Sequence, residues 1–207
     1  MKTSELLERN AAAWQEATRH PFLEAVGVGE FPTGAFESWL VQDYLFVGDA
    51  LVFQAGLLAR APRPTQAVLA GGLVAIEAEL GWFEEHAEQR GLALDTPRHP
   101  TTAAYGGFLI SLEHEPYPAA ITALWAVERA YLEAWMGAAP GHPDYGQFVE
   151  HWTTREFADY VTGLEEAADD ALRSASEQER ERAQTAFLEV ARLERDFWEM
   201  AWSGAAR

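Results

Sequence analysis

Apolar positions recur along almost the whole chain with the spacing of α-helices. In the segment 36–49, FESWLVQDYLFVGD, the apolar residues that share one helical face are Phe36, Trp39, Leu40, Phe46 and Val47. Similar stripes predict helices over residues of about 3–18, 22–26, 32–60, 65–89, 101–115, 118–135, 144–173 and 177–202. Proline and glycine mark most of the breaks, and no segment alternates like a β-strand. We therefore expect a single-domain, all-α helical bundle over residues 1–207.

Asp43 lies in the middle of the apolar stripe of the segment 36–49. Burial of an unpaired carboxylate would cost several kcal/mol, so the side chain must have a partner. One interpretation is an aspartate satisfied by a neighbouring arginine or a backbone amide. The other is a carboxylate that binds a cationic or amidine-like ligand in an aromatic pocket. Asp49 falls on a different face of the same helix, and we expect it to be solvated.

Three further polar residues interrupt apolar stripes, namely Tyr105, Glu128 and Glu194. Each glutamate alone is compatible with a solvent-facing position, because glutamate is a good helix former and is usually exposed. Together with Asp43, the three residues indicate a pocket between helices, where bundles commonly bind ligands. Two carboxyl groups in such a pocket can have their pKa values pushed apart. One would then orient the ligand while the other transfers a proton.

Composition narrows the class of protein. A chain of 207 residues can fill one core, and no apolar run approaches the length of a membrane span. The net charge of −18 repels phosphates and disfavours nucleic-acid binding. The absence of cysteine excludes disulfides and fits the cytoplasm, and the first residues are typical of an amphipathic helix rather than a secretory signal. The 8 Trp and 11 Phe either fill the core or line a pocket for a flat ligand.

Metal and cofactor sites find little support in the sequence. Helical di-iron sites need Glu-x-x-His pairs, and none of the six histidines has that spacing. His20 could be proposed as a haem ligand, but the following Pro21 favours a place at a helix end. No G-x-S-x-G nucleophile motif is present, and the Gly71-Gly72 pair lies inside a helical pattern, where it would permit close packing. We expect no resident cofactor.

Four segments together resemble the TenA family, the thiaminase II proteins of the haem-oxygenase-like all-α fold. They are His20-Pro21-Phe22, Trp39-Leu40-Val41-Gln42-Asp43-Tyr44, Pro100-Thr101-Thr102-Ala103-Ala104-Tyr105 and Phe197-Trp198-Glu199-Met200-Ala201-Trp202. The resemblance covers nearly the whole chain. It implies hydrolysis of an aminopyrimidine in thiamin salvage, in a homodimer or homotetramer.

The resemblance also implies roles for individual residues. Asp43 corresponds to the aspartate that binds the ring nitrogen and amino group of the pyrimidine, and Tyr105 to a tyrosine that lines the pocket. Glu194 corresponds to the glutamate that donates and accepts protons. The better-known branch uses a cysteine nucleophile, which this chain lacks. The chain therefore resembles the cysteine-less subgroup, and Glu128 is the candidate to replace the cysteine.

Two aromatic positions depart from the cysteine branch. Trp152 stands where a tyrosine is usual, and Phe46 stands where a tyrosine is common. With Tyr105, these rings would contact the pyrimidine. The departures favour hydrolysis of amino- or formylamino-methylpyrimidine over cleavage of intact thiamin. The alternatives are a non-catalytic binding protein for an aromatic ligand, a haem or metal oxygenase on the same fold, and a transcriptional activator, which the net charge disfavours.

Overall fold

The computed structural model describes residues 1–204, which form a helical bundle that contains no β-strand within that range. The helices are α1 (Thr3–Arg9), α2 (Ala11–Thr18), α3 (Pro21–Val28), α4 (Ala35–Arg60), α5 (Arg63–Arg90), α6 (Pro100–Ser111), a 3₁₀ turn η1 (Leu112–His114), α7 (Tyr117–Ala138), α8 (Gly146–Trp152), α9 (Arg155–Ser174) and α10 (Glu177–Trp202). The predicted all-α class is confirmed.

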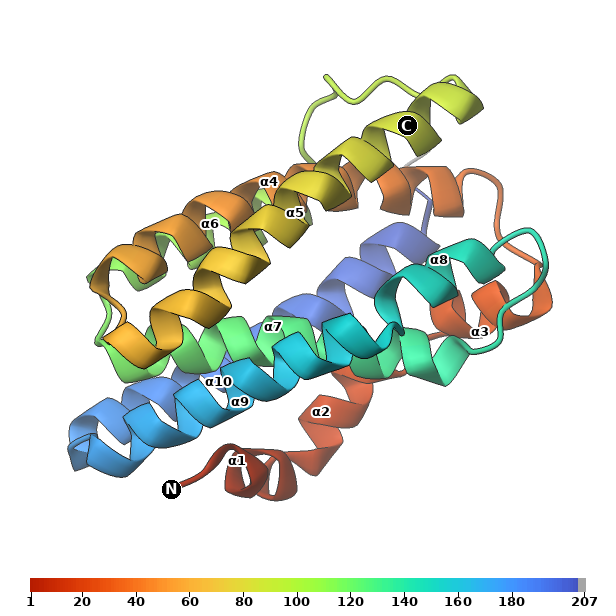
Figure 1. The fold of residues 1–207 in the computed structure, drawn as a ribbon. Coiled ribbons are helices and arrows are strands. Elements are labelled where there is room, and N and C mark those ends of the chain that lie inside the picture. Colours follow the sequence, from red (N-terminus) through yellow and green to blue (C-terminus); the bar gives the residue numbers. More distant parts are fainter. Residues whose placement is uncertain (205–207) are drawn as a thin grey trace.

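Two layers of long helices make up the bundle. Figure 1 shows α4, α5 and α6 in one layer and α7, α9 and α10 in the other, with α2 beside the second layer and α3 and α8 at one end. Helix α4 contacts both α5 and α6, and α7 contacts both α9 and α10. Because α4 also packs on α7, side chains from both layers meet at the centre of the molecule.

A cluster of large aromatic rings fills the end of the core that adjoins α8. The rings of Trp39 and Trp135 lie 5.2 Å apart, and those of Trp135 and Trp152 lie 4.7 Å apart. Tyr131 contacts the same cluster, with its ring centroid 5.3 Å from that of Trp152. Aromatic pairs at these distances add to the stabilisation that burial gives. The cluster fixes the two residues, Tyr131 and Trp152, that reach the pocket described below.

Two of the predicted helices are each broken into two. The predicted helix 3–18 is interrupted at Asn10, whose side-chain amide donates to the carbonyl of Leu6 at 2.8 Å. The predicted helix 144–173 is interrupted at Thr153 and Thr154, and the Thr154 hydroxyl accepts from the amide of Phe157 to cap α9. Short polar side chains compete for backbone hydrogen bonds in this way. The predicted helix 22–26 is longer, extending from Pro21 to Val28.

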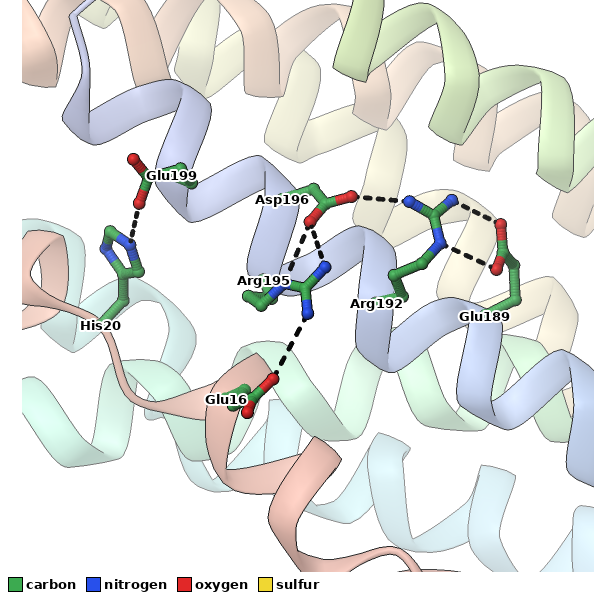
Figure 2. Close-up of polar contacts among 7 residues, drawn as sticks. All are labelled: Glu16, His20, Glu189, Arg192, Arg195, Asp196 and Glu199. Carbon is green, nitrogen blue, oxygen red and sulfur yellow. Dashed lines mark hydrogen bonds and ion pairs between the residues drawn. The ribbon is translucent and has the colours of Figure 1, made fainter.

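His20 lies at a helix boundary, as predicted, where it is the N-cap residue of α3. Its Nδ1 accepts a hydrogen bond from the amide of Phe22 at 3.1 Å, so the imidazole caps the helix. Its Nε2 lies 3.2 Å from a carboxylate oxygen of Glu199 on α10 (Figure 2). Both ring nitrogens are therefore engaged within the protein.

The outer face of α10 carries a network of ion pairs. Figure 2 shows Arg192 between Glu189 and Asp196, and Arg195 between Asp196 and Glu16 of α2. These side chains are substantially exposed, and exposed pairs each contribute at most about 1 kcal/mol. The network helps to join α2 to α10 but does not reach the core.

Helix α5 contains a long apolar stretch. An 18-residue window of α5 has a mean hydropathy of 1.2, so its length and composition alone would allow it to cross a membrane. This finding contradicts the sequence expectation that no apolar run approaches the length of a membrane span. In the structure, 22% of that window is buried. Buried residues such as Leu69, Ile76 and Phe83 pack one face of α5 against the core.

Gly72 allows α5 to approach its neighbours closely. A Cβ atom at this position would lie 2.3 Å from Nε2 of Gln54 and 2.6 Å from the hydroxyl of Tyr160. The hydroxyl of Tyr160 in turn donates to Oε1 of Gln54 at 2.9 Å. At Gly71 a Cβ atom would meet nothing within 4 Å. The predicted close packing therefore belongs to Gly72 alone.

Candidate active site

Five helices enclose a small buried pocket at the centre of the bundle. Its lining comes from α4, α5, α7, α8 and α9 and consists of Asp43, Phe46, Val47, Ala50, Ile76, Glu79, Val127, Glu128, Tyr131, Trp152 and Phe157. Four of the six residues singled out in the sequence, Asp43, Phe46, Glu128 and Trp152, line this pocket. The structure thus brings together residues that are up to 109 positions apart in the chain.

Asp43 is almost fully buried, with 1% of its surface exposed. Its Oδ2 accepts a hydrogen bond from the hydroxyl of Tyr131 on α7. The partner of Asp43 is therefore a tyrosine, and not the arginine or backbone amide of the first interpretation. Burial raises the pKa of Asp43 well above its usual range, and the negative charges of Glu79 and Glu194 add to the rise, while the bond from Tyr131 opposes it.

Glu128 lines the pocket without a hydrogen-bond partner among residues 1–204. Burial raises the pKa of Glu128 to about 8, and the nearby carboxyl groups of Glu79 and Glu194 contribute. A carboxyl group with a pKa near neutrality can both accept and donate a proton at physiological pH. Glu128 is thus available to act on a ligand or a water molecule in the pocket.

Glu194 and Tyr105 form a buried pair beside the pocket and are not part of its lining. The Tyr105 hydroxyl donates to Oε1 of Glu194 at 2.6 Å, and the Tyr105 ring packs against Phe46 at 4.4 Å. Burial raises the pKa of Glu194 to about 8, although the bond from Tyr105 lowers it. The pair is therefore coupled to the pocket through the ring of Phe46 and through the electrostatic effect of Glu194 on Asp43.

Glu79 and Tyr131 also line the pocket, and sequence reasoning did not single them out. Oε1 of Glu79 accepts a hydrogen bond from the indole N–H of Trp152 at 2.7 Å, and burial raises the pKa of Glu79 to about 7. A signal was present for Glu79, which follows Ile76 by three positions and precedes Phe83 by four, on the buried face of α5. Tyr131 likewise follows Glu128 by one helical turn.

Asp49 is not simply solvated, contrary to the sequence expectation. Its carboxylate forms an ion pair with Arg98, which comes from the segment before α6, and 18% of its side chain is exposed. The pair lies against Gly106, where a Cβ atom would come within 2.1 Å of Oδ2 of Asp49. The expectation for Asp49 was wrong because its ion pair with Arg98 joins two segments that are far apart in the chain, and helical periodicity does not predict such contacts.

Within residues 1–204, the ionisable groups that line the pocket are all carboxyl groups, apart from the hydroxyl of Tyr131. Three carboxyl groups line it, those of Asp43, Glu79 and Glu128, and its lining among the described residues contains no Lys, Arg or His. The pKa values of all three groups are raised, with burial as the leading cause. Such a site favours a ligand that carries positive charge or presents several N–H donors.

The pocket has a volume of about 40 Å³, which is room for a few water molecules. It adjoins an outer groove of about 770 Å³ between α5 and α9, and the two share Glu79, Trp152 and Phe157. Entry of a ring-sized ligand therefore requires movement of side chains at this shared wall. Among residues 1–204, no group of three or more His, Asp or Glu side chains is placed to bind a metal ion.

Comparison with known proteins identifies the family of this chain. The model of the TENA/THI-4/PQQC family matches residues 7–204. A relative from Glycine max, described as a probable bifunctional TENA-E protein, is 31% identical over 211 positions that cover 96% of this chain and 92% of the relative. An aminopyrimidine aminohydrolase from Halalkalibacterium halodurans is 24% identical over 96% of this chain and 94% of its own length.

The fold matches a solved TenA homologue from Pyrococcus furiosus with a TM-score of 0.93 and 32% identity, covering 98% of this chain and 100% of that structure. A TenA homologue from Pyrococcus horikoshii matches with a TM-score of 0.86 over 98% and 99% of the two chains, and at 20% identity it supports the fold alone. The resemblance predicted from the four sequence segments is confirmed. The chain belongs to the TENA/THI-4/PQQC family.

Proposed function

We propose that the protein is an aminopyrimidine hydrolase of thiamin salvage, which breaks a C–N bond of an amino- or formylamino-methylpyrimidine. The observation that carries the proposal is the buried pocket in which Asp43 and Glu128 face a shared space without a cation in its lining. Relatives that span nearly the whole chain bear the name aminopyrimidine aminohydrolase, which supports the same chemistry.

Asp43 is the residue proposed to recognise the aminopyrimidine. The ring nitrogen and the adjacent amino group of this ligand form an edge with one acceptor and donor N–H groups. A carboxyl group can match that edge with two parallel hydrogen bonds, either as the acid or as a carboxylate opposite a protonated ring. The raised pKa of Asp43 is compatible with both forms, and Tyr131 holds the carboxyl in place. The rings of Phe46 and Trp152 would border the pyrimidine.

The reaction needs one group to accept a proton from water and one to hold or supply the proton on the departing nitrogen. We assign these roles to Glu128 and Glu194, in either order. A new C–O bond forms from the water and the exocyclic C–N bond breaks, so that the amine leaves as ammonia and a hydroxymethylpyrimidine remains. With the formylamino compound, water attacks the formyl carbon and the amide C–N bond breaks, so that formate is released and the aminomethylpyrimidine remains. Glu128 lines the pocket directly, whereas Glu194 acts from beside Tyr105.

The test is an assay of ammonia and formate release by the purified protein on the two methylpyrimidines. Multiple turnovers with a hydroxymethylpyrimidine product support the proposal. Calorimetric binding of both compounds without any turnover would instead identify a non-catalytic binding protein. An absorption spectrum and metal analysis of the same sample test the oxygenase alternative.

We further propose a cytoplasmic homodimer or homotetramer. Support comes from exposed apolar side chains on the surface of the bundle, including Val52 and Ile110 beside a groove between α4 and α6. Light scattering after size-exclusion chromatography measures the oligomeric state. A monomer at micromolar concentration would contradict this assignment.

A further inference from the structure

Glu79 lies between the small inner pocket and the outer groove, and among the described residues it is the one carboxyl group that lines both. It lines the small inner pocket together with Asp43 and Glu128, and it also lines the outer groove between α5 and α9. Trp152 and Phe157 are the other residues common to both spaces. Whatever part of a ligand lies nearest the groove must therefore contact one of these three side chains.

One oxygen of the Glu79 carboxyl group accepts a hydrogen bond, and the other oxygen accepts none from the described residues. The indole N–H of Trp152 donates to Oε1 at 2.7 Å, which fixes the direction of the side chain. The second oxygen of Glu79 has no hydrogen-bond partner among residues 1–204. Glu79 also acts electrostatically on both Asp43 and Glu128, which places its charge within reach of the same ligand.

The surroundings of Glu79 supply no competing positive charge. The outer groove contains Glu156 and Asp159 but no Lys or Arg in its described lining. Its one histidine is His151, whose pKa is lowered to about 4 by burial and by His86, so the imidazole is neutral near pH 7. The ligand itself must therefore provide any cation that pairs with Glu79.

We propose that Glu79 is a specificity-determining residue that binds the protonated exocyclic amino group of an aminomethylpyrimidine at the groove side of the pocket. This inference rests on the proposed function and extends it. An ammonium group presents three donors and a full charge to the free oxygen of Glu79. A formylamino group at the same position is neutral, and a hydroxymethyl group is neutral as well. Glu79 therefore selects the amino substrate over the formylamino one.

The experiment compares Glu79→Gln with the wild type and with Glu77→Gln, a matched control on the exposed side of the same helix. The kcat and KM are measured for the aminomethyl and formylaminomethyl compounds. Calorimetry gives the Kd of these two compounds and of the hydroxymethyl compound. For Glu79→Gln we expect kcat/KM for the amino substrate to fall at least tenfold, the scale of a charge-assisted hydrogen bond. The formylamino value and the hydroxymethyl Kd should stay within about threefold, and Glu77→Gln should change none of the three.

Three results would overturn the inference. Unchanged selectivity in Glu79→Gln means that Glu79 does not contact the amino group. An equal loss for all three compounds means that Glu79 only maintains the shape of the pocket. If the wild type binds the compounds without turnover, the proposed function fails, and a selective loss of aminomethyl affinity in Glu79→Gln still supports the role of Glu79. If the wild type binds none of them, both proposals are wrong.

Discussion

The hydroxyl of Tyr131 donates a hydrogen bond to Asp43 and so joins α7 to α4 across the floor of the pocket. The contact explains how a carboxyl group can be 1% exposed in a bundle whose pocket lining, as far as it is described, holds no cation. One bond does not satisfy a carboxyl group, which has about four acceptor positions when ionised. The remaining capacity of Asp43 is what a ligand with N–H groups can use.

Asp43→Asn should weaken the binding of a hydroxymethylpyrimidine by about 1.5–3 kcal/mol, because it removes a charge-assisted pair of hydrogen bonds. Isothermal calorimetry gives the Kd. Asp49→Asn is the matched control, since Asp49 pairs with Arg98 and does not line the pocket. Equal affinities for the wild type and Asp43→Asn would refute the role assigned to Asp43.

Turnover should fall at least a hundredfold in both Glu128→Gln and Glu194→Gln, on the order of the loss expected when a general acid or base is removed. Steady-state ammonia release measures kcat. The amide side chain keeps the shape of each glutamate and can still accept the hydrogen bond from Tyr105 at position 194. Thermal melting near that of the wild type would show that the variants are folded. Near-normal rates in both variants would rule out the assignment.

The buried glutamates should make the protein less stable as pH rises. The pKa of Glu194 is about 8 in the folded protein against an ordinary value of 4.5, so folding favours the protonated form. This contribution to stability is fully present below about pH 4.5 and is lost as pH rises towards 8. Urea denaturation between pH 5 and pH 8.5 should therefore show a smaller decline in the free energy of unfolding for Glu194→Gln than for the wild type. The same decline in both proteins would contradict the raised pKa.

Adjacent glycines of α5 should respond in opposite directions to alanine. Gly71→Ala should stabilise the protein by about 0.5–1 kcal/mol, because alanine is the better helix former and nothing lies within 4 Å of the new methyl group. Gly72→Ala should destabilise it by about 1–3 kcal/mol, because the methyl group would overlap Gln54 and Tyr160. Chemical denaturation of the two variants gives both values. Equal effects would show that α5 is not closely packed at Gly72.

Helical periodicity was sufficient to predict the class of fold and the central place of Asp43, because a carboxylate within an apolar stripe has few explanations. It also located Glu128 within a stripe that reaches the pocket. The breaks at Asn10 and at Thr153 could not be predicted from proline or glycine. They arise from side-chain hydrogen bonds to the backbone, which apolar patterns do not record.

Contacts between distant segments set the limit of what the sequence predicts. Glu79 belongs to an acidic run, although its spacing from Ile76 and Phe83 places it on the buried face of α5. Only the packing of α5 against α8 and α9 shows that its carboxyl reaches the pocket. The ion pair of Asp49 with Arg98 depends on the path of the chain before α6. Tyr105 and Glu194 are 89 positions apart in the chain, and their hydrogen bond depends on the packing of α6 against α10, which helical periodicity does not predict.

Hydrolysis in ¹⁸O-labelled water is the measurement that tests the proposed activity most directly. The wild-type protein is incubated with the aminomethylpyrimidine in labelled water, and the product is analysed by mass spectrometry. Attack by water on the exocyclic carbon predicts one ¹⁸O atom in the hydroxymethyl group and one molecule of ammonia for each molecule of product. Recovery of unchanged aminomethylpyrimidine, or of a product without label, would contradict the proposal that this pocket hydrolyses a C–N bond.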